Sequence, residues 1–526
     1  MSTKTNAQDD IIADLLVVGS GAAGASAALR AAEAGLNVIM LTGAGDPLES
    51  NSDHAQGGIV ARPPGDSAAE LAADIMAAGD GICNPEAVRL LAESVPEIMR
   101  FLVEDLKVEL SRDPQGNLDY TQEAAHSRRR IAHADDATGH AITSRILDAV
   151  EAEPRITLAP RQTAVDLITT PHHALDPTAV YREVECRGAY ALDQASGKVR
   201  RYLASHTVLA TGGLGQLYVH TTNPRVARGD GLAMAFRAGA QIINAEYVQF
   251  HPTAFYHRDA ERFLITESVR GEGAVLRRRD GTEFMHEYHP DGSLASRDVV
   301  ARAIHEEMLK SGAEYVLLDL APLSVDPKVR FPTAYEKLMQ FGVDITKQPI
   351  PVVPAAHYFC GGVKVDTWGH TSIRRLYAVG EVSCTGLHGA NRLASTSLAE
   401  AILWGQRAGE DAVATHEPVP PDLPAGIAVW HDEGLTEDTD PLLIIQDWMM
   451  IKSTMWNYAG IVRTAKRLQR AGADLNYLAH RVEQFYRETK LADSLVGLRN
   501  GITSAQIIAD AALRNPTSRG CHFRRD

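Results

Sequence analysis

The stretch IIADLLVVGSGAAG, which runs from Ile11 to Gly24, decides the fold of this chain. Its first half is an apolar run with β-branched residues and predicts a strand that ends at Val18. The glycine turn G-S-G-A-A-G follows directly, and an alanine-rich helical segment, Ala25–Ala34, follows the turn. A second apolar run covers Val38–Leu41. Strand, glycine turn, helix and strand within about thirty residues are the βαβ unit that binds dinucleotides.

The residues of the glycine turn suit the phosphates of such a ligand. The first glycine permits the tight turn, the second lets the backbone approach a pyrophosphate, and the third lets the helix pack on the strand. The N-terminus of the helix adds free N–H groups and a partial positive charge. We therefore predict that a nucleotide lies along Ser20, Gly21, Ala22, Ala23 and Gly24.

The second strand lacks the acid that usually holds the adenosine ribose. It ends in Leu41-Thr42-Gly43, so Thr42 or the backbone near Gly43 is left to make that contact.

Composition places the chain among ordinary globular proteins. Of its 526 residues, 45% are hydrophobic and 23% are charged, which excludes collagen-like, coiled-coil and disordered chains. The formal charge of −15 argues against a general binder of nucleic acid or anionic membrane, although a local cluster of Arg and His can still bind an anionic substrate. The five cysteines lie far apart without a C-x-x-C pair, which fits a reducing compartment and offers no metal site. Without a secretory leader pattern or an apolar run near ~20 residues, we expect a cytoplasmic protein with no membrane span.

Two short apolar segments predict strands that return to the first sheet. Thr207–Ala210 precedes two glycines, and Leu376–Val379 precedes Gly380-Glu381, as at a sheet edge that meets a ligand. Between them the sequence becomes polar and rich in His and Arg, which predicts an inserted domain. A Pro-rich linker follows Glu417, and helical periodicity runs from Leu442 to Leu513. The predicted domains are 11–245 and 356–415 for the nucleotide-binding part, 246–355 for a capping substrate domain, and 425–526 for a helical domain.

Several polar segments are candidates for a site, and each has a plain structural alternative. The loop Asn51-Ser52-Asp53-His54-Ala55-Gln56-Gly57-Gly58 brings backbone N–H groups close to a flat ring or a phosphate, or is an ordinary surface loop. His251 and His357 are each, taken alone, more often structural histidines. Thr266 and Glu267 open a segment that is either a site loop or a salt-bridged turn, and Arg297 is more often a solvated or paired residue.

The strongest single segment is GLHGANRLASTSL, from Gly386 to Leu398. Glu381, just before it, can accept hydrogen bonds from a ribityl chain. Ser397 and Leu398 begin a helix whose first amides face a ligand. Arg392 offers a forked guanidinium that suits a carboxylate.

Together these segments resemble the flavoprotein family of succinate dehydrogenase, fumarate reductase and L-aspartate oxidase, over about residues 11 to 415 and into the tail. Three strings resemble the L-aspartate oxidases in particular: Ser127–Ile131 with His133 and Asp136-Ala137-Thr138-Gly139, then Pro354–Gly362, then Met455–Arg463. The resemblance implies an α/β fold: a Rossmann-like FAD-binding domain, an inserted α+β capping domain and a C-terminal helical bundle. It implies FAD-dependent oxidation of L-aspartate to iminoaspartate, with O₂ or fumarate as acceptor, as the first step of NAD (quinolinate) biosynthesis. A quinolinate synthase is the protein partner that this place implies.

The resemblance also assigns roles to residues. FAD would lie along Ser20–Gly24, the Asn51–Gly58 loop, Asp230, Glu381 and Ser397–Leu398, and the dicarboxylate would be held by His251, Thr266, Glu267, His357 and Arg392. Arg297 matches the residue that handles the proton. Glu123 matches an acid that the dehydrogenases lack, and its carboxylate can pair with the substrate ammonium. We expect closure of the capping domain over the flavin to bring these groups together.

Three positions depart from the family pattern. Gly43 stands where the oxidases commonly have Lys, and Thr396 stands where Asn is usual. Asn51 occupies the position at which the dehydrogenases attach FAD covalently through a histidine, so we predict non-covalent FAD. The alternatives are a succinate dehydrogenase or fumarate reductase flavoprotein subunit, against which Asn51 and Glu123 argue, and a flavin-binding protein without turnover.

Overall fold

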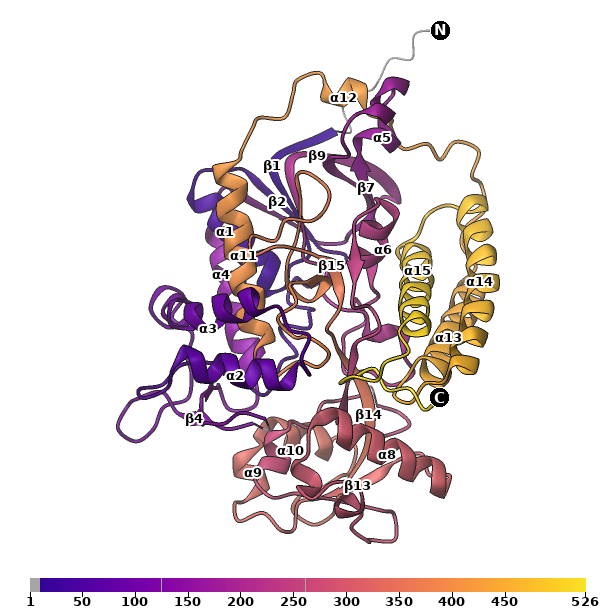
Figure 1. Ribbon diagram of the computed structural model, residues 1–526. Coiled ribbons are helices and arrows are strands. Elements are labelled where there is room, and N and C mark those ends of the chain that lie inside the picture. Colours follow the sequence, from indigo (N-terminus) through magenta and orange to yellow (C-terminus); the bar gives the residue numbers. More distant parts are fainter. Residues whose placement is uncertain (1–9, 124, 261) are drawn as a thin grey trace.

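The computed structural model describes residues 10–123, 125–260 and 262–526. The predicted βαβ unit forms its centre (Figure 1): β1 (Asp10–Val18), α1 (Ala22–Glu33) and β2 (Val38–Leu41), with β1 and β2 parallel. Gly19 has a φ of +116°, and a Cβ there would lie 2.1 Å from the Ala210 carbonyl oxygen. The turn therefore needs glycine both for its backbone angle and for the close approach of the neighbouring strand.

The central sheet has the strand order β6-β2-β1-β9-β8-β7, and β16 pairs with β9. Both predicted return strands lie in it, because β9 pairs in parallel with β1, and β16 in parallel with β9. The remaining bounds are β6 (Ile156–Ala159), β7 (Gln162–Thr169), β8 (Cys186–Asp193), β9 (Lys198–Leu209) and β16 (Leu376–Ala378). The carboxyl ends of the parallel strands thus share one edge, where ligands bind in sheets of this type.

Helices cover one face of this sheet, and two of them approach very closely. On α11 (Ser397–Ala414), a Cβ at Gly405 would lie 2.3 Å from the Ala23 carbonyl oxygen of α1. Gly409 is similarly close to Ala27. The short side chains let α11 lie directly on α1, so its first turn reaches the glycine turn at the sheet edge. The other helices of this part are α2 (Ala68–Ala78), α3 (Pro85–Arg100), which continues into a π-helical turn at Phe101–Asp105, α4 (Thr138–Ala152), α5 (Thr170–His173) and α6 (Asp230–Arg237).

The inserted segment forms a cap with a sheet and a core of its own, at the bottom of Figure 1. Its strand order is β11-β14-β13-β12. The chain enters along β11 and leaves along β14, so these two strands connect the cap to the rest of the molecule. The bounds are β11 (Val248–Phe255), α7 (Ser268–Gly271), β12 (Val275–Arg277), α8 (Arg297–Ser311), β13 (Val316–Asp319), α9 (Pro327–Arg330), α10 (Pro332–Met339) and β14 (Ile350–Phe359).

One predicted domain limit falls within a strand. The limit between residues 355 and 356 falls inside β14, because a single strand serves both the cap sheet and the connection back. The change in composition, from polar and rich in His and Arg to apolar, marks the end of the polar insert and not the end of β14.

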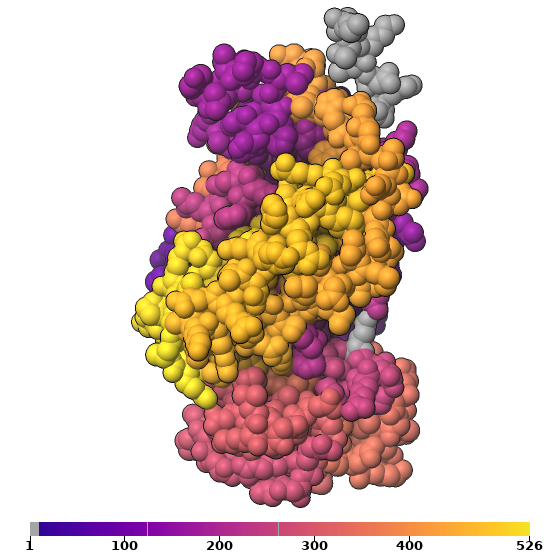
Figure 2. All heavy atoms as spheres, turned by 90° about the vertical axis from the view of Figure 1, so that its right-hand side faces the viewer, coloured from indigo at the N-terminus to yellow at the C-terminus, as the bar shows by residue number. Residues whose placement is uncertain are grey.

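The tail forms three helices, α13 (Pro441–Tyr458), α14 (Ala465–Glu488) and α15 (Asp493–Arg514), after a short α12 (Leu423–Gly426). They share a core with the central sheet and α6, and Figure 2 shows them as an outer layer above the cap. On α13, Met455 is buried, Trp448, Met450 and Trp456 are half-buried, and Met449 is exposed. The tail therefore packs on the sheet along one side, while Leu442, Leu443, Ile445 and Met449 of α13 and Tyr477 of α14 stay exposed.

Two small sheets complete the fold. One joins β3 (Ile59–Val60), β5 (Ile131–Ala132) and β4 (Tyr120–Thr121), and the other joins β10 (Ile242–Ile243), β15 (Gly362–Lys364) and β17 (Ser383–Cys384). Within the described ranges, no helix has the length and apolar character needed to cross a membrane. The same residues hold no group of three or more His, Cys, Asp or Glu side chains that could bind a metal ion.

Candidate active site

A cavity lies between the carboxyl edge of the central sheet and the cap. The sheet side contributes the glycine turn, the loop from Glu49 to Gly58 and the segment Arg392–Leu398, and the cap contributes His251, Thr266, Glu267 and Arg297. Of the residues predicted for cofactor and substrate, those that line the cavity are Ser20, Gly21, Ala23, Gly43, Asn51, Ser52, His54, Ala55, Gln56, Gly57, Gly58, Glu123, Asp230, His251, Thr266, Glu267, Arg297, His357, Glu381, Arg392, Ser397 and Leu398.

Three predicted cofactor residues do not line this cavity. Asp53 accepts a 2.8 Å hydrogen bond from Nδ1 of the exposed His140. Gly24 packs on the turn itself, because a Cβ there would lie 2.1 Å from the Gly19 carbonyl oxygen. Ala22 is fully buried under the turn. These three residues therefore shape the glycine turn and the loop that follows β2, and they do not line the cavity.

The sheet edge fits a flavin nucleotide by its hydrogen-bonding groups. The Glu381 carboxylate accepts bonds from the Phe359 backbone N–H at 2.9 Å and from Asn51 Nδ2 at 2.6 Å. Burial raises the pKa of Glu381 to about 7, so hydroxyl donors from a ribityl chain would stabilise its charged form. Asn51 Oδ1 and the Thr211 hydroxyl are buried without a partner, which leaves further polar groups for a ligand.

At the adenosine end most polar groups already form hydrogen bonds with other protein groups. The Gly43 carbonyl accepts a 2.7 Å bond from Gln194, and the Thr42 hydroxyl accepts one from the Ala44 N–H at 3.3 Å. Asp230 is held by Arg228 at 2.9 Å and by Asn500 of α15 at 2.9 Å. The tail helices thus help to position this end of the cavity, a role that the sequence did not indicate.

His251 presents an unpartnered N–H to the cavity. It lies in β11 before Pro252, where the register with β14 shifts and frees the proline from the ladder. Its Nδ1 accepts a 3.3 Å bond from the Thr253 N–H, so the neutral ring carries its proton on Nε2, which is buried without a partner. Burial and the Arg297 guanidinium hold the pKa of His251 well below its ordinary value. The ring is therefore a neutral donor.

Arg392 is a buried cation without a carboxylate partner. Its guanidinium donates to His357 Nε2 at 3.2 Å and to the Ser397 hydroxyl at 3.2 Å, and Nε is unpartnered. It stacks on the Tyr358 ring at 4.7 Å, and no ion pair joins it to an acid of the described residues. Because a buried charge is costly unless paired, this guanidinium is suited to bind an anion.

His357 lies beside this cation and is also neutral. Because Arg392 can only donate, His357 Nε2 accepts, and Nδ1 donates to the Thr222 hydroxyl at 2.9 Å. Burial and the Arg392 charge hold the pKa of His357 well below its ordinary value. The rings of His357 and His251 lie 5.2 Å apart, so Arg392 and the two histidines form one continuous wall.

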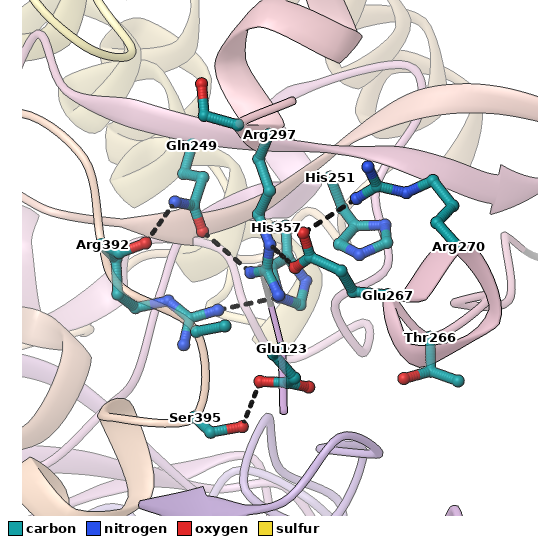
Figure 3. A network of polar contacts seen from close by, with 12 residues as sticks. Glu123, Gln249, His251, Thr266, Glu267, Arg270, Arg297, His357, Arg392 and Ser395 are labelled. Atoms are coloured by element: carbon teal, nitrogen blue, oxygen red, sulfur yellow. Dashed lines mark hydrogen bonds and ion pairs between the residues drawn. The ribbon is translucent and has the colours of Figure 1, made fainter. Parts of the chain in front are cut away.

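The cap supplies a buried chain of charged groups. Glu267 accepts from Arg297 Nε at 2.6 Å and from Arg270 Nη2 at 2.9 Å (Figure 3). Burial acts to raise the pKa of Glu267, but the Arg297 and Arg270 charges outweigh it and hold the pKa below its usual value. Gln249 accepts from Arg297 at 3.3 Å and donates to the Arg392 carbonyl at 2.9 Å, so it bridges the cap chain to the Arg392 segment.

Glu123 approaches the same cavity from the sheet side. Its Oε2 accepts a 2.6 Å bond from the Ser395 hydroxyl, and Ser395 has an unusual φ of 60°. A Cβ at Gly57 would lie 2.3 Å from Glu123 Oε1, so that glycine makes room for the carboxylate. Glu123 is 4% exposed, which places a carboxylate in a site otherwise rich in arginine.

Sequence reasoning missed the residues that hold these groups in place. Gln249, Thr222, Tyr358 and Ser395 all contact predicted site residues. Tyr358 and Ser395 lie inside the quoted strings Pro354–Gly362 and Gly386–Leu398, which offered a signal for them, whereas Gln249 and Thr222 lie in segments without a pattern of their own.

Comparison with known proteins agrees with this geometry. The FAD binding domain family matches residues 14–398, and the family described as fumarate reductase flavoprotein C-term matches residues 449–526. The chain is 44% identical to L-aspartate oxidase 1 of Ralstonia nicotianae and 43% identical to L-aspartate oxidase of Pseudomonas aeruginosa, each over 98% of this chain and 95% of the relative. An L-aspartate oxidase of Halobacterium salinarum is 43% identical over 98% and 97%.

The chain belongs to the L-aspartate oxidase family. The resemblance predicted from the three oxidase strings is therefore confirmed, and so is FAD as the cofactor of the fold. The fold of this chain resembles E. coli quinol fumarate reductase, with a TM-score of 0.86 at 29% identity over 98% of this chain and 92% of that one. Mycobacterium smegmatis Sdh1 has a TM-score of 0.81 at 29% identity over 98% and 89%.

Proposed function

We propose that this chain oxidises L-aspartate to iminoaspartate with FAD, and that O₂ or fumarate takes up the electrons. The observation that carries the proposal is the buried Arg392, which forms no ion pair with a carboxylate of the described residues and shares one cavity with Glu123 and the N–H of His251. A small molecule with two carboxylates and one ammonium satisfies all three groups. The 41–44% identity to curated L-aspartate oxidases from several bacteria supports the same reaction.

Two poles hold the two carboxylates in this proposal. Arg392 and His357 form the first, where the guanidinium donates in a forked geometry that suits a carboxylate. His251 Nε2 and the Thr266 hydroxyl form the second, on the cap side. Because the histidines are neutral, they orient the substrate by hydrogen bonds, and the main charge attraction comes from arginine.

Glu123 distinguishes an amino acid from its deaminated analogue. Its carboxylate lies in the cavity and accepts from Ser395 on one oxygen, so an ammonium group of the substrate can pair with it. Succinate and fumarate have no such group. The residue thus gives aspartate a favourable contact that the other dicarboxylates cannot make.

When bound, FAD supplies the acceptor for the hydride that leaves the Cα of aspartate. The protein residues hold the substrate rigidly and exclude water, since the cap covers the cavity and most of the wall is buried. Arg297 is a poor base because its guanidinium stays protonated. It acts instead as an orienting donor, with Glu267 and Arg270 behind it as a proton path in the fumarate-reducing direction.

Anaerobic titration of the holoenzyme tests the proposal. Aspartate should bleach the flavin absorbance, whereas succinate at the same concentration should not. Bleaching by succinate alone would instead identify a dehydrogenase of the fumarate reductase type, and bleaching by neither compound would identify a flavin-binding protein without turnover.

The place of the reaction in metabolism follows from its product. Because iminoaspartate is unstable in water, the proposal includes a quinolinate-forming enzyme that consumes it. The proposal also places the reaction in the cytoplasm. Attachment of FAD without a covalent bond is part of the same proposal, because Asn51 offers an amide where a nucleophilic imidazole would be needed.

A further inference from the structure

The oxidase string Asp136-Ala137-Thr138-Gly139 has no part in the catalytic cavity, yet its first residue crosses to the cap. Asp136 follows β5 in the FAD-binding part and is only 6% exposed. Its Oδ1 accepts a 2.5 Å bond from the Thr333 hydroxyl, and its Oδ2 accepts a 3.1 Å bond from the Ala334 backbone N–H. Both donors belong to the first turn of α10 in the cap.

Helix α10 begins without a capping side chain of its own. Its N-cap position is the apolar Phe331, which makes no capping hydrogen bond, and Pro332 occupies its first turn. Free N–H groups at a helix N-terminus attract a carboxylate. Asp136 therefore acts as an N-cap that is supplied from a different part of the molecule, and this contact exists only while the cap is closed.

The other end of the same string is attached to the cofactor loop. The Gly139 N–H donates to the Ala55 carbonyl at 2.7 Å, and the Thr138 hydroxyl donates to the Gln56 carbonyl at 3.4 Å. A Cβ at Gly139 would lie 2.1 Å from the Ser52 carbonyl oxygen, so no larger residue fits there. The string thus links the loop that lines the FAD cavity to α10.

Within the cap, α10 is connected to the residues that face the substrate. Phe331 belongs to the same core cluster as Ile265 and Val269, on either side of Thr266 and Glu267. Arg330 forms a 3.1 Å ion pair with Glu272, just after α7. Because closely packed side chains transmit a displacement to their neighbours, the position of α10 determines the position of Thr266 and Glu267.

We propose that Asp136 is a positioning residue that latches the cap over the cofactor loop and so places Thr266, Glu267 and Arg297 against the substrate. The inference rests on the proposed function, and it adds a determinant of closure to it. It separates two tasks: Arg392 and Glu123 recognise the substrate, whereas Asp136 sets how much of the enzyme is in the closed state that can react.

The test uses the holoenzyme with Asp136→Asn, Asp136→Ala, Thr333→Val and the double variant Asp136→Ala/Thr333→Val. Asp135→Asn is the matched control, since Asp135 is exposed and its φ of 47° is tolerated by Asn. The latch predicts that kcat/KM for aspartate oxidation and for fumarate reduction fall together, by about tenfold for Asp136→Ala and less for Asp136→Asn. The melting temperature should stay close to that of the wild type.

Two further readouts separate a latch from a general structural role. Hydrogen–deuterium exchange should become faster in the first turn of α10, residues 332–335, and stay unchanged in α1. The double variant should lose no more activity than Asp136→Ala, because both changes remove the same contact. Wild-type kinetics in Asp136→Ala, additive losses in the double variant, or faster exchange throughout the FAD-binding part would each overturn the proposal. If the wild-type enzyme fails to oxidise aspartate, the proposed function fails, but the exchange measurement still tests the latch because it needs no substrate.

Discussion

Replacing Glu123 with Gln changes one charge in the cavity and very little else. Gln has the same shape, and its amide oxygen can still accept the bond that Ser395 donates at 2.6 Å. The side chain is therefore expected to stay between Gly57 and Ser395, while the attraction for an ammonium group disappears.

The magnitude follows from the burial of the carboxylate, which is 4% exposed. Removing one partner of a buried, hydrogen-bonded charge pair costs about 2–5 kcal/mol. A mid-range loss of about 3 kcal/mol corresponds to a decrease of roughly 150-fold in kcat/KM for aspartate. Fumarate has no ammonium, so its reduction lacks this loss. Glu123 also offsets the positive charge on Arg392 and Arg270, so fumarate should bind Glu123→Gln as tightly as the wild type or more tightly.

The assay compares kcat/KM for aspartate oxidation with kcat/KM for fumarate reduction by the reduced enzyme. Ser395→Gly serves as a control, because glycine accepts the φ of 60° and removes the hydroxymethyl side chain that donates to Glu123. It should show a smaller loss with aspartate and none with fumarate. Equal losses on both substrates in Glu123→Gln would contradict the reasoning and make Glu123 a structural residue.

Two further predictions concern Arg297 and Glu381. Arg297→Leu should abolish fumarate reduction and lower aspartate oxidation much less, since the substrate amine can lose its proton without this residue. Steady-state rates of aspartate oxidation and of fumarate reduction test this prediction. If both activities were retained, Arg297 would have no part in the mechanism. FAD should bind the apo-chain more tightly as pH rises, by up to about tenfold per unit below neutrality. The reason is that the buried Glu381, with a pKa of about 7, holds a proton below that pH and releases it on accepting ribityl donors. Above about pH 7 the FAD affinity should no longer change with pH. Fluorescence titration of Glu381→Gln should find no pH dependence of FAD binding. If this variant kept the pH dependence of the wild type, the proton would belong to another group.

The cofactor half of the molecule could be predicted from the sequence because its determinants are local. The strand, glycine turn and helix from Asp10 to Glu33 lie within one continuous segment, and the close approach at Gly19 needs a residue without a side chain. The family also follows from continuous strings such as Pro354–Gly362. Such features depend on backbone geometry over a few residues, which the local sequence encodes directly.

The substrate half required the tertiary structure. His251 and Arg297 became candidates only through resemblance, since each one alone is more often structural, whereas the Gly386–Leu398 segment already indicated Arg392 as a carboxylate ligand. The pairing of Arg297 with Glu267 depends on how the cap folds, and the absence of an ion pair between Arg392 and any described carboxylate depends on how the cap packs on the sheet. The same holds for the contact of Asp136 with Thr333 and for Asp53, whose carboxylate bonds to His140 outside the cavity. Burial and pairing of charges are properties of segments far apart in the chain, so the packing free energy of the whole fold decides them, and no local pattern records the result.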